Sequence, residues 1–171
     1  MASSTQHPVR TAVLAVGAVG AAAAVWGIGI ERHLYTLRRH TVAVLAPGSA
    51  PIRVLHISDV HMAPWQRRKQ AWIASLASLR PDLIINTGDN LGHPDAVRGI
   101  RAAFAGFRGI PGAFVHGSND LFASAPRNPL RYFLGPSKNH SREVRLDTEA
   151  MDSFFTSTLG WHDVNNAAAT V

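Results

Sequence analysis

Three short polar clusters in this chain have the residue types of a hydrolytic metal centre. Each cluster closes an apolar run, and together they offer carboxylate, imidazole and amide groups. Divalent metals such as Mn²⁺, Fe and Zn²⁺ accept these groups as ligands in enzymes that hydrolyse esters. The clusters are Asp59-Val60-His61, Gly88-Asp89 and Gly117-Ser118-Asn119-Asp120.

The apolar runs before the clusters predict the strands that position them. Residues 52–58, 82–87 and 112–116 are short runs bounded by Gly, Pro and Asp, as buried strands are. Ligands of open α/β sheets bind at the carboxyl ends of the strands. We therefore expect the polar side chains that follow these runs to converge on one site.

Helical periodicity between the runs predicts a parallel sheet. Residues 69–79 and 94–107 each repeat apolar side chains at helical spacing, which indicates two amphipathic crossover helices. The order β-α-β-α-β with short links implies right-handed crossovers. A further helix is predicted at 148–159, with Thr148 as its N-cap, and a further strand at 161–164. A short strand is expected at 41–45 and a long polar surface loop at 123–143.

The ordered motifs resemble those of the calcineurin-like metallophosphoesterase family, which reads D-x-H, then G-D, then G-N-H-D or G-N-H-E. The first two motifs match outright, the third matches with departures, and the resemblance covers Ile52 to Asn165. It implies an α/β fold, half of a metallophosphoesterase sandwich. It also implies two divalent metal ions (Mn, Fe or Zn) and hydrolysis of a phosphomonoester or phosphodiester.

The resemblance also implies a role for each residue of the first two motifs. Asp59 and His61 would hold the first metal, and the one-residue gap lets both side chains point the same way from a strand end. Asp89 would bridge both metals, because one carboxylate has two oxygens to share.

The third motif leaves one assignment open. Aligned without a gap, Ser118 replaces the metal-binding Asn of the family, and Asn119 replaces its catalytic His. A shift by one residue instead makes Asn119 the amide ligand, and we favour this reading because an amide oxygen suits the position better than a hydroxyl. Asp120 keeps the carboxylate that supports the catalytic His, so the resemblance implies Asn119 and Asp120 as the catalytic residues. His116 stands one residue before the motif, where core packing is the simpler reading and partial substitution for the missing His is the alternative.

Composition excludes several classes of protein. The chain has 171 residues and a formal charge of +6, carried mostly by scattered arginines. This scatter indicates a solvated surface, and we expect no nucleic-acid partner because no basic face is interleaved with aromatic residues. The absence of cysteine excludes disulfides and thiolate metal sites.

A twenty-residue uncharged segment, 11–30, predicts a transmembrane helix. At about 1.5 Å per residue it spans roughly 30 Å, the thickness of a bilayer core. A cleaved signal peptide and a buried soluble helix are the alternatives. The expectation is a single-pass membrane protein with the side of its catalytic domain left open. A membrane anchor would make a lipid head group a candidate substrate.

The expected organisation has four parts, of which the last is an incomplete domain. In the family, two further histidine motifs follow, a lone histidine and a G-H-x-H, and neither is present here. The alternative to an enzyme is therefore a catalytically inactive fragment, or a membrane-tethered binding module that retains part of the site. The parts are an N-terminal tail (1–10), the transmembrane helix (11–30), a connector (31–50) and the metallophosphoesterase domain (51–171).

Overall fold

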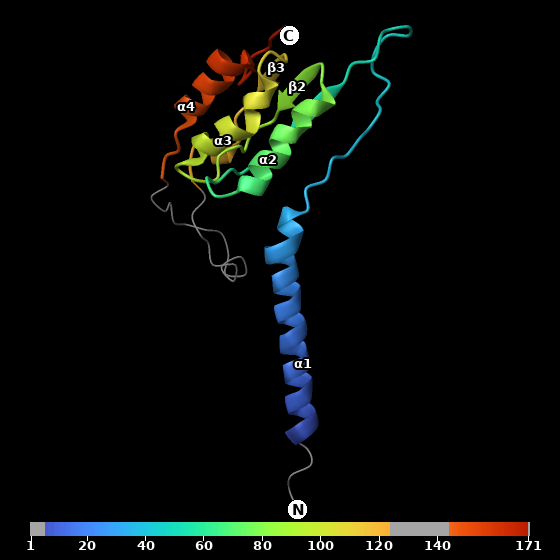
Figure 1. Cartoon of the computed structure of the whole chain (residues 1–171), viewed down its shortest axis with the longest axis vertical. Helices are drawn as coiled ribbons and strands as arrows, with labels where there is room; N and C mark the ends of the chain where they lie inside the picture. Colours follow the sequence, from blue (N-terminus) through green and yellow to red (C-terminus); the bar gives the residue numbers. More distant parts are fainter. Residues whose placement is uncertain (1–5, 124–143, 171) are drawn as a thin grey trace, which may run out of the picture. The chain divides into compact units, whose positions relative to one another are not determined.

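A computed structural model describes residues 6–123 and 144–170 of the chain. The chain divides into two compact units, one ending at Val42 and the other beginning at Ala43 (Figure 1). The predicted four-part division stays a prediction, since the two units do not test its boundaries.

The first unit contains one long helical segment that ends at His33. Helix α1 (Gln6–Ala24) continues into a π-helical stretch η1 (Val25–Ile30) and a 3₁₀ turn η2 (Glu31–His33). Its apolar side chains are exposed within the described chain. The segment from Pro8 to His33 is long and apolar enough to cross a membrane, by length and composition.

The second unit is built on a parallel sheet with helices between its strands, which confirms the predicted α/β class. All strand pairs are parallel, and the strands follow one another in sheet order as they do in sequence. Such neighbouring parallel strands need crossovers, and the helices supply them. The strands are β1 (Val54–Ile57), β2 (Leu83–Asn86), β3 (Gly112–Phe114) and β4 (His162–Asp163).

Alternation along the first strand shows that the sheet buries one face more than the other. Leu55 and Ile57 are buried, whereas Val54 and His56 between them are exposed. In the next strand Ile84, which pairs with Leu55, is again fully buried. The period of two is that of a strand with one covered face.

The helices bury aromatic and aliphatic side chains in a common core with the sheet. Figure 1 shows α2, α3 and α4 lying together, and helix contacts join α2 to α3 and α3 to α4. The core includes Ile84, Phe104, Phe114 and Phe155, and the ring of Phe155 stacks on Trp161 at 5.1 Å. The helical segments are α2 (Arg67–Ser75) with η3 (Leu76–Leu79), α3 (Ala96–Phe104) with η4 (Ala105–Phe107), and α4 (Thr148–Ser153) with η7 (Phe154–Leu159).

Three local expectations differ from the structure or fall outside it. The short strand expected at 41–45 does not form; Val42 and Val44 are exposed, and neither pairs with a strand in the described part of the chain. The N-cap of α4 is Asp147, whose carboxylate accepts the N–H of Ala150 at 3.0 Å, so Thr148 is the first helical residue. Most of the predicted long loop at 123–143 lies outside the described residues.

Candidate metal centre

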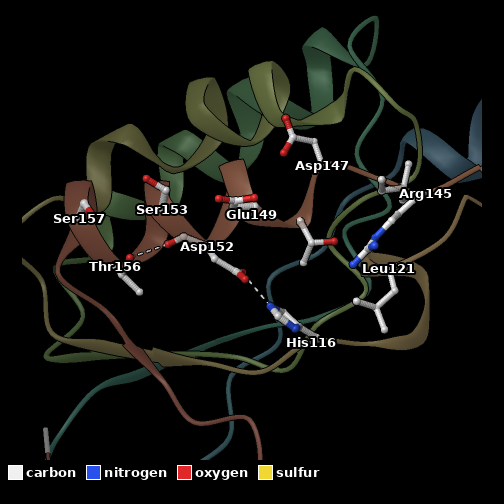
Figure 2. A pocket seen from close by; sticks show the side chains of 11 residues that line it. His116, Leu121, Arg145, Asp147, Glu149, Asp152, Ser153, Thr156 and Ser157 are labelled. Carbon is white, nitrogen blue, oxygen red and sulfur yellow. Dashed lines mark hydrogen bonds and ion pairs between the residues drawn. The ribbon is translucent and has the colours of Figure 1, made fainter.

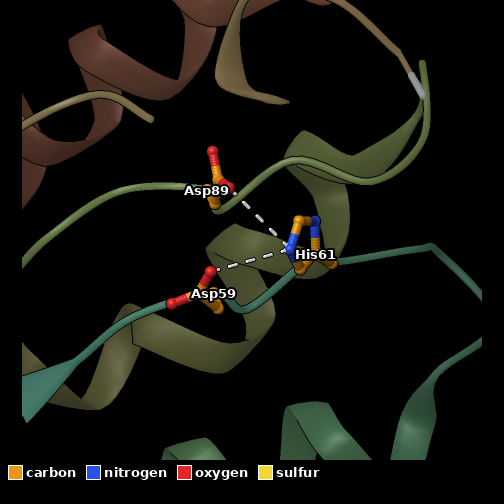
Figure 3. A group of neighbouring side chains, drawn as sticks. All are labelled: Asp59, His61 and Asp89. Atoms are coloured by element: carbon orange, nitrogen blue, oxygen red, sulfur yellow. Dashed lines mark ion pairs between the residues drawn. The ribbon is translucent and has the colours of Figure 1, made fainter. Parts of the chain in front are cut away.

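The loops after β1 and β2 bring two carboxylates and an imidazole together at one edge of the sheet (Figure 3). One ligand atom each from Asp59, His61 and Asp89 lies within 4.8 Å of the others. The Nε2 atom of His61 is 3.9 Å from an oxygen of Asp59 and 4.0 Å from an oxygen of Asp89. These spacings leave room for a cation between the three groups, and their chemistry fits Mn²⁺, Fe or Zn²⁺.

All three residues have a left-handed backbone. The φ angle is 53° at Asp59, 41° at His61 and 54° at Asp89. Residues other than glycine rarely adopt this conformation, and it persists only where the surroundings enforce it. Three of the five described non-glycine residues with a positive φ belong to this cluster, which makes it a candidate functional site.

Backbone hydrogen bonds between the two loops enforce this conformation. The N–H groups of Asp59 and His61 donate to the carbonyls of Gly88 and Asp89, at 3.0 and 2.9 Å. The N–H of Met62 donates to the carbonyl of Asn90 at 2.7 Å. The D-x-H and G-D motifs are therefore joined into one unit before any metal binds.

Two motif glycines allow the loops to come this close. A Cβ added at Gly88 would lie 2.2 Å from the backbone nitrogen of Gly117. One added at Gly117 would lie 2.0 Å from a carboxylate oxygen of Asp89. Any larger side chain at either position would push the second and third motifs apart.

The third motif forms a 3₁₀ turn, η5 (Ser118–Asp120), that contacts the cluster through Asn119. The backbone N–H of Asn119 donates to Oδ1 of Asp89 at 2.9 Å, and its side-chain amide N–H donates to Oδ2 at 2.8 Å. The nitrogen of the amide thus faces Asp89, whereas the predicted ligand role needs its oxygen. The structure places Asn119 beside Asp89, and its role as a metal ligand stays a prediction.

Asp120 occupies a buried position next to the cluster. Its Oδ1 accepts the N–H groups of Asn90 and Leu91, at 2.7 and 2.9 Å, and its Oδ2 accepts the N–H of Gly117 at 2.9 Å. These contacts hold backbone rather than a histidine. The predicted catalytic role of Asp120 stays a prediction, and its geometry is that of a residue that orders the loops.

A second polar group lies where His116 follows β3. Nε2 of His116 is 2.7 Å from a carboxylate oxygen of Asp152 on α4 (Figure 2). Both side chains line a cavity of about 720 Å³ together with Arg145 and Glu149. The strand-end position of His116 had suggested packing in the apolar core. Instead, its side chain is partly buried and makes a polar contact with Asp152.

Burial raises the pKa of Asp152 above its ordinary value. The hydrogen bond from His116 and its charge act in the opposite direction and are smaller effects. The Asp152 carboxyl is therefore easier to protonate in the folded chain than in the unfolded one.

A family comparison identifies the domain that carries the cluster. The family model described as calcineurin-like phosphoesterase matches residues 52–165, which is more than half of the chain. The chain belongs to the calcineurin-like phosphoesterase family. A search of curated proteins and a search of solved structures gave no match. The family membership and the parallel sheet agree with the resemblance seen in the sequence.

The sequence motifs located the cluster in this domain but missed one buried residue beside it. Asn86 is the last residue of β2 and is buried, with its side chain hydrogen-bonded to Asn90. The signal was an amide at the end of the apolar run Leu83–Ile85, where a buried strand normally continues with an apolar residue.

Proposed function

We propose that this chain is a membrane-anchored phosphoesterase that hydrolyses a phosphomonoester or a phosphodiester with two divalent metal ions. One observation carries the proposal: in a domain of the phosphoesterase family, donor atoms of Asp59, His61 and Asp89 lie within 4.8 Å of one another. Substrate identity, membrane attachment and the number of metals go beyond that observation and belong to the proposal.

The proposed ligands divide between the two metals. Asp59 and His61 would bind one metal, Asp89 would bind both, and Asn119 would bind the other. When bound, such metals lower the pKa of a coordinated water and neutralise charge on the phosphoryl oxygens. Three protein ligands plus water is the usual complement of a catalytic zinc site, so the described residues fit one metal well.

The side chains of the cluster are accessible from solvent to different degrees. The side chain of Asp59 is 69% exposed and that of His61 is 43% exposed, whereas that of Asp89 is 19% exposed. A phosphoester can therefore approach over Asp59 and His61. Asp89 stays fixed beneath them by its two hydrogen bonds from Asn119.

The apolar segment from Pro8 to His33 supports the proposed anchor. A phosphoesterase tethered by such a segment would work close to a lipid surface, so we include phospholipid head groups among the proposed substrates. No nucleic-acid partner is proposed.

Hydrolysis of a chromogenic phosphodiester tests the proposed activity. The full chain, purified in detergent, is assayed with bis(p-nitrophenyl) phosphate and with p-nitrophenyl phosphate in the presence of Mn²⁺. We expect turnover that EDTA abolishes and that Asp59→Asn lowers by at least about 100-fold, because a carboxylate ligand is lost. Equal turnover by wild type and variant would refute the proposed site.

A tethered binding module is the second candidate function. Among the described residues, Asp89 and Asn119 alone are assigned to the second metal, fewer than the three protein ligands of a typical catalytic site. This function predicts binding of Mn²⁺ without turnover of either substrate. Metal binding together with turnover favours the enzyme.

A further inference from the structure

Asp89 is the central residue of the metal centre, and its backbone is fixed on both sides. It combines a φ of 54° with side-chain contacts to Asn119 and proximity to His61. Asn119 holds the side chain of Asp89, and separate contacts hold the backbone before and after it. Its two neighbours, Gly88 and Asn90, each donate a backbone N–H to a buried polar side chain.

The first of these side chains is Asn86. Its Oδ1 accepts the N–H of Gly88 at 2.9 Å, which fixes the residue before Asp89. The amides of Asn86 and Asn90 also pair with each other in both directions, at 2.8 and 3.0 Å. Both amides are buried, so every hydrogen bond that they lose would leave a polar group unsatisfied in the core.

The second side chain is Asp120, which fixes the residue after Asp89. Its carboxylate accepts three backbone N–H groups, from Asn90, Leu91 and Gly117. Two of these belong to the loop after β2 and one to the third motif. Asp120 thereby sets the distance between the loop that carries Asp89 and the turn that carries Asn119.

We propose that the buried cradle, formed by Asn86, Asn90 and Asp120, is a positioning device for metal binding. It holds Asp89 in its left-handed conformation and in register with His61, so that the ligands are pre-arranged before the ion arrives. The cradle depends on the metal centre of the proposed function, and it gives Asp120 a positioning role instead of contact with substrate. Partners that orient metal ligands typically affect affinity by about 10–100-fold.

Substitution of Asp120 by the isosteric amide provides the test. Asp120→Asn keeps the shape but replaces one acceptor oxygen by an NH₂ donor, which opposes a backbone N–H. The affinity of the full chain in detergent for Mn²⁺ is measured by electron paramagnetic resonance, and folding is checked by circular dichroism and thermal melting. We expect the affinity of the folded variant to fall about 10–100-fold.

Asp147→Asn is the matched control. Asp147 also accepts a backbone N–H with its carboxylate, but at the start of α4. We expect this variant to keep wild-type affinity for Mn²⁺ and to stay close to the wild type in thermal stability, because asparagine caps a helix about as well as aspartate does. A purely structural role for Asp120 predicts wild-type affinity for Mn²⁺ in folded Asp120→Asn as well, and that result would overturn the proposal.

Two further measurements cover the remaining outcomes. If Asp120→Asn does not fold, Asn86→Ala is measured instead. This variant removes the side chain that accepts the N–H of Gly88, and we expect it to weaken Mn²⁺ binding by a similar factor. Unchanged affinity would refute the cradle.

If the wild type binds no Mn²⁺, the metal centre itself is refuted. Amide hydrogen exchange in the absence of metal then decides whether Asp120 positions the loops. Faster exchange at Asn90, Leu91 and Gly117 in Asp120→Asn than in Asp147→Asn supports this, and equal exchange contradicts it.

Discussion

At the scale of single residues, the three side chains of the candidate centre all extend from residues with a left-handed backbone conformation. A left-handed φ at Asp59, His61 and Asp89 turns each side chain away from the strand direction and toward a common point. Among residues other than glycine, aspartate and histidine adopt this conformation more often than most. Strain of this kind is found where the surrounding hydrogen bonds enforce it and where function requires the geometry.

A pH-dependent prediction follows from Asp152. Because burial raises its pKa in the folded chain, ionisation costs more there than in the unfolded chain. The contribution of Asp152 to the free energy of unfolding is therefore highest at low pH, and it falls as the pH rises through the pKa of the folded state. Asp152→Asn does not ionise, and its amide oxygen can still accept from His116. We therefore expect the Tm of Asp152→Asn, relative to wild type, to rise between about pH 3 and pH 7.

Thermal melts of both proteins across that pH range measure the difference. A Tm difference that becomes smaller as the pH rises would contradict the expected direction. It would mean that the hydrogen bond with His116 outweighs the effect of burial.

At the scale of elements, close contact between loops brings the three motifs together at one place. The loop after β2 lies against the loop after β1 through backbone hydrogen bonds and against the third motif through Gly88 and Gly117. The glycines of the G-D motif and of the third motif are therefore needed for space as well as for backbone conformation.

Alanine substitution separates these two needs. Gly88 and Gly109 have similar φ angles, 90° and 82°, but only at Gly88 does an added Cβ meet other atoms, the nearest at 2.2 Å. We expect Gly109→Ala to cost about 1–2 kcal/mol from backbone strain. Gly88→Ala should cost about 2–5 kcal/mol, because overpacking adds to the same strain.

Chemical denaturation of both variants provides the free energies of unfolding. Equal losses at the two positions would show that the loops can separate at little cost. The close packing of the second and third motifs would then not be required for folding.

The main elements were predictable because their signals are local. Apolar runs and helical periodicity predicted the strands and the helices that the structure contains, and strand ends correctly indicated where Asp59, His61 and Asp89 gather. The sequence showed an amide at the end of the second apolar run, but the role proposed for Asn86 depends on a reciprocal contact with Asn90 that arises only after the chain folds. The cap of α4 was misplaced by one residue, since Asp147 and Thr148 are both good caps by type.

At the scale of the whole molecule, a long apolar helical segment and a phosphoesterase domain belong to one chain. The segment from Pro8 to His33 is long and apolar enough to cross a membrane, and its apolar side chains are exposed. Exposure of so many apolar side chains to water is unfavourable, at roughly 25 cal/mol per Å² of apolar surface. Insertion into a bilayer would remove that cost.

Membrane association is tested by extraction at alkaline pH. We expect the full chain to remain in the membrane pellet after carbonate treatment, and a variant with Leu14→Arg and Val19→Arg to be released. Charged residues near the middle of a spanning helix cost about 2.5–3.5 kcal/mol each on insertion scales. Release of the wild-type chain would count against a spanning anchor.

Binding of Mn²⁺ to the full chain in detergent tests the metal centre most directly. The wild type and two variants, Asp89→Asn and Asp95→Asn, are titrated with Mn²⁺ and followed by electron paramagnetic resonance. Asp95 is a carboxylate with an exposed side chain outside the cluster, so its variant is the control. We predict that Asp89→Asn weakens binding by more than about 100-fold, since a ligand matters more than its outer partners, while Asp95→Asn binds as the wild type does. Equal binding by all three proteins would contradict the assignment of Asp59, His61 and Asp89 as the metal site.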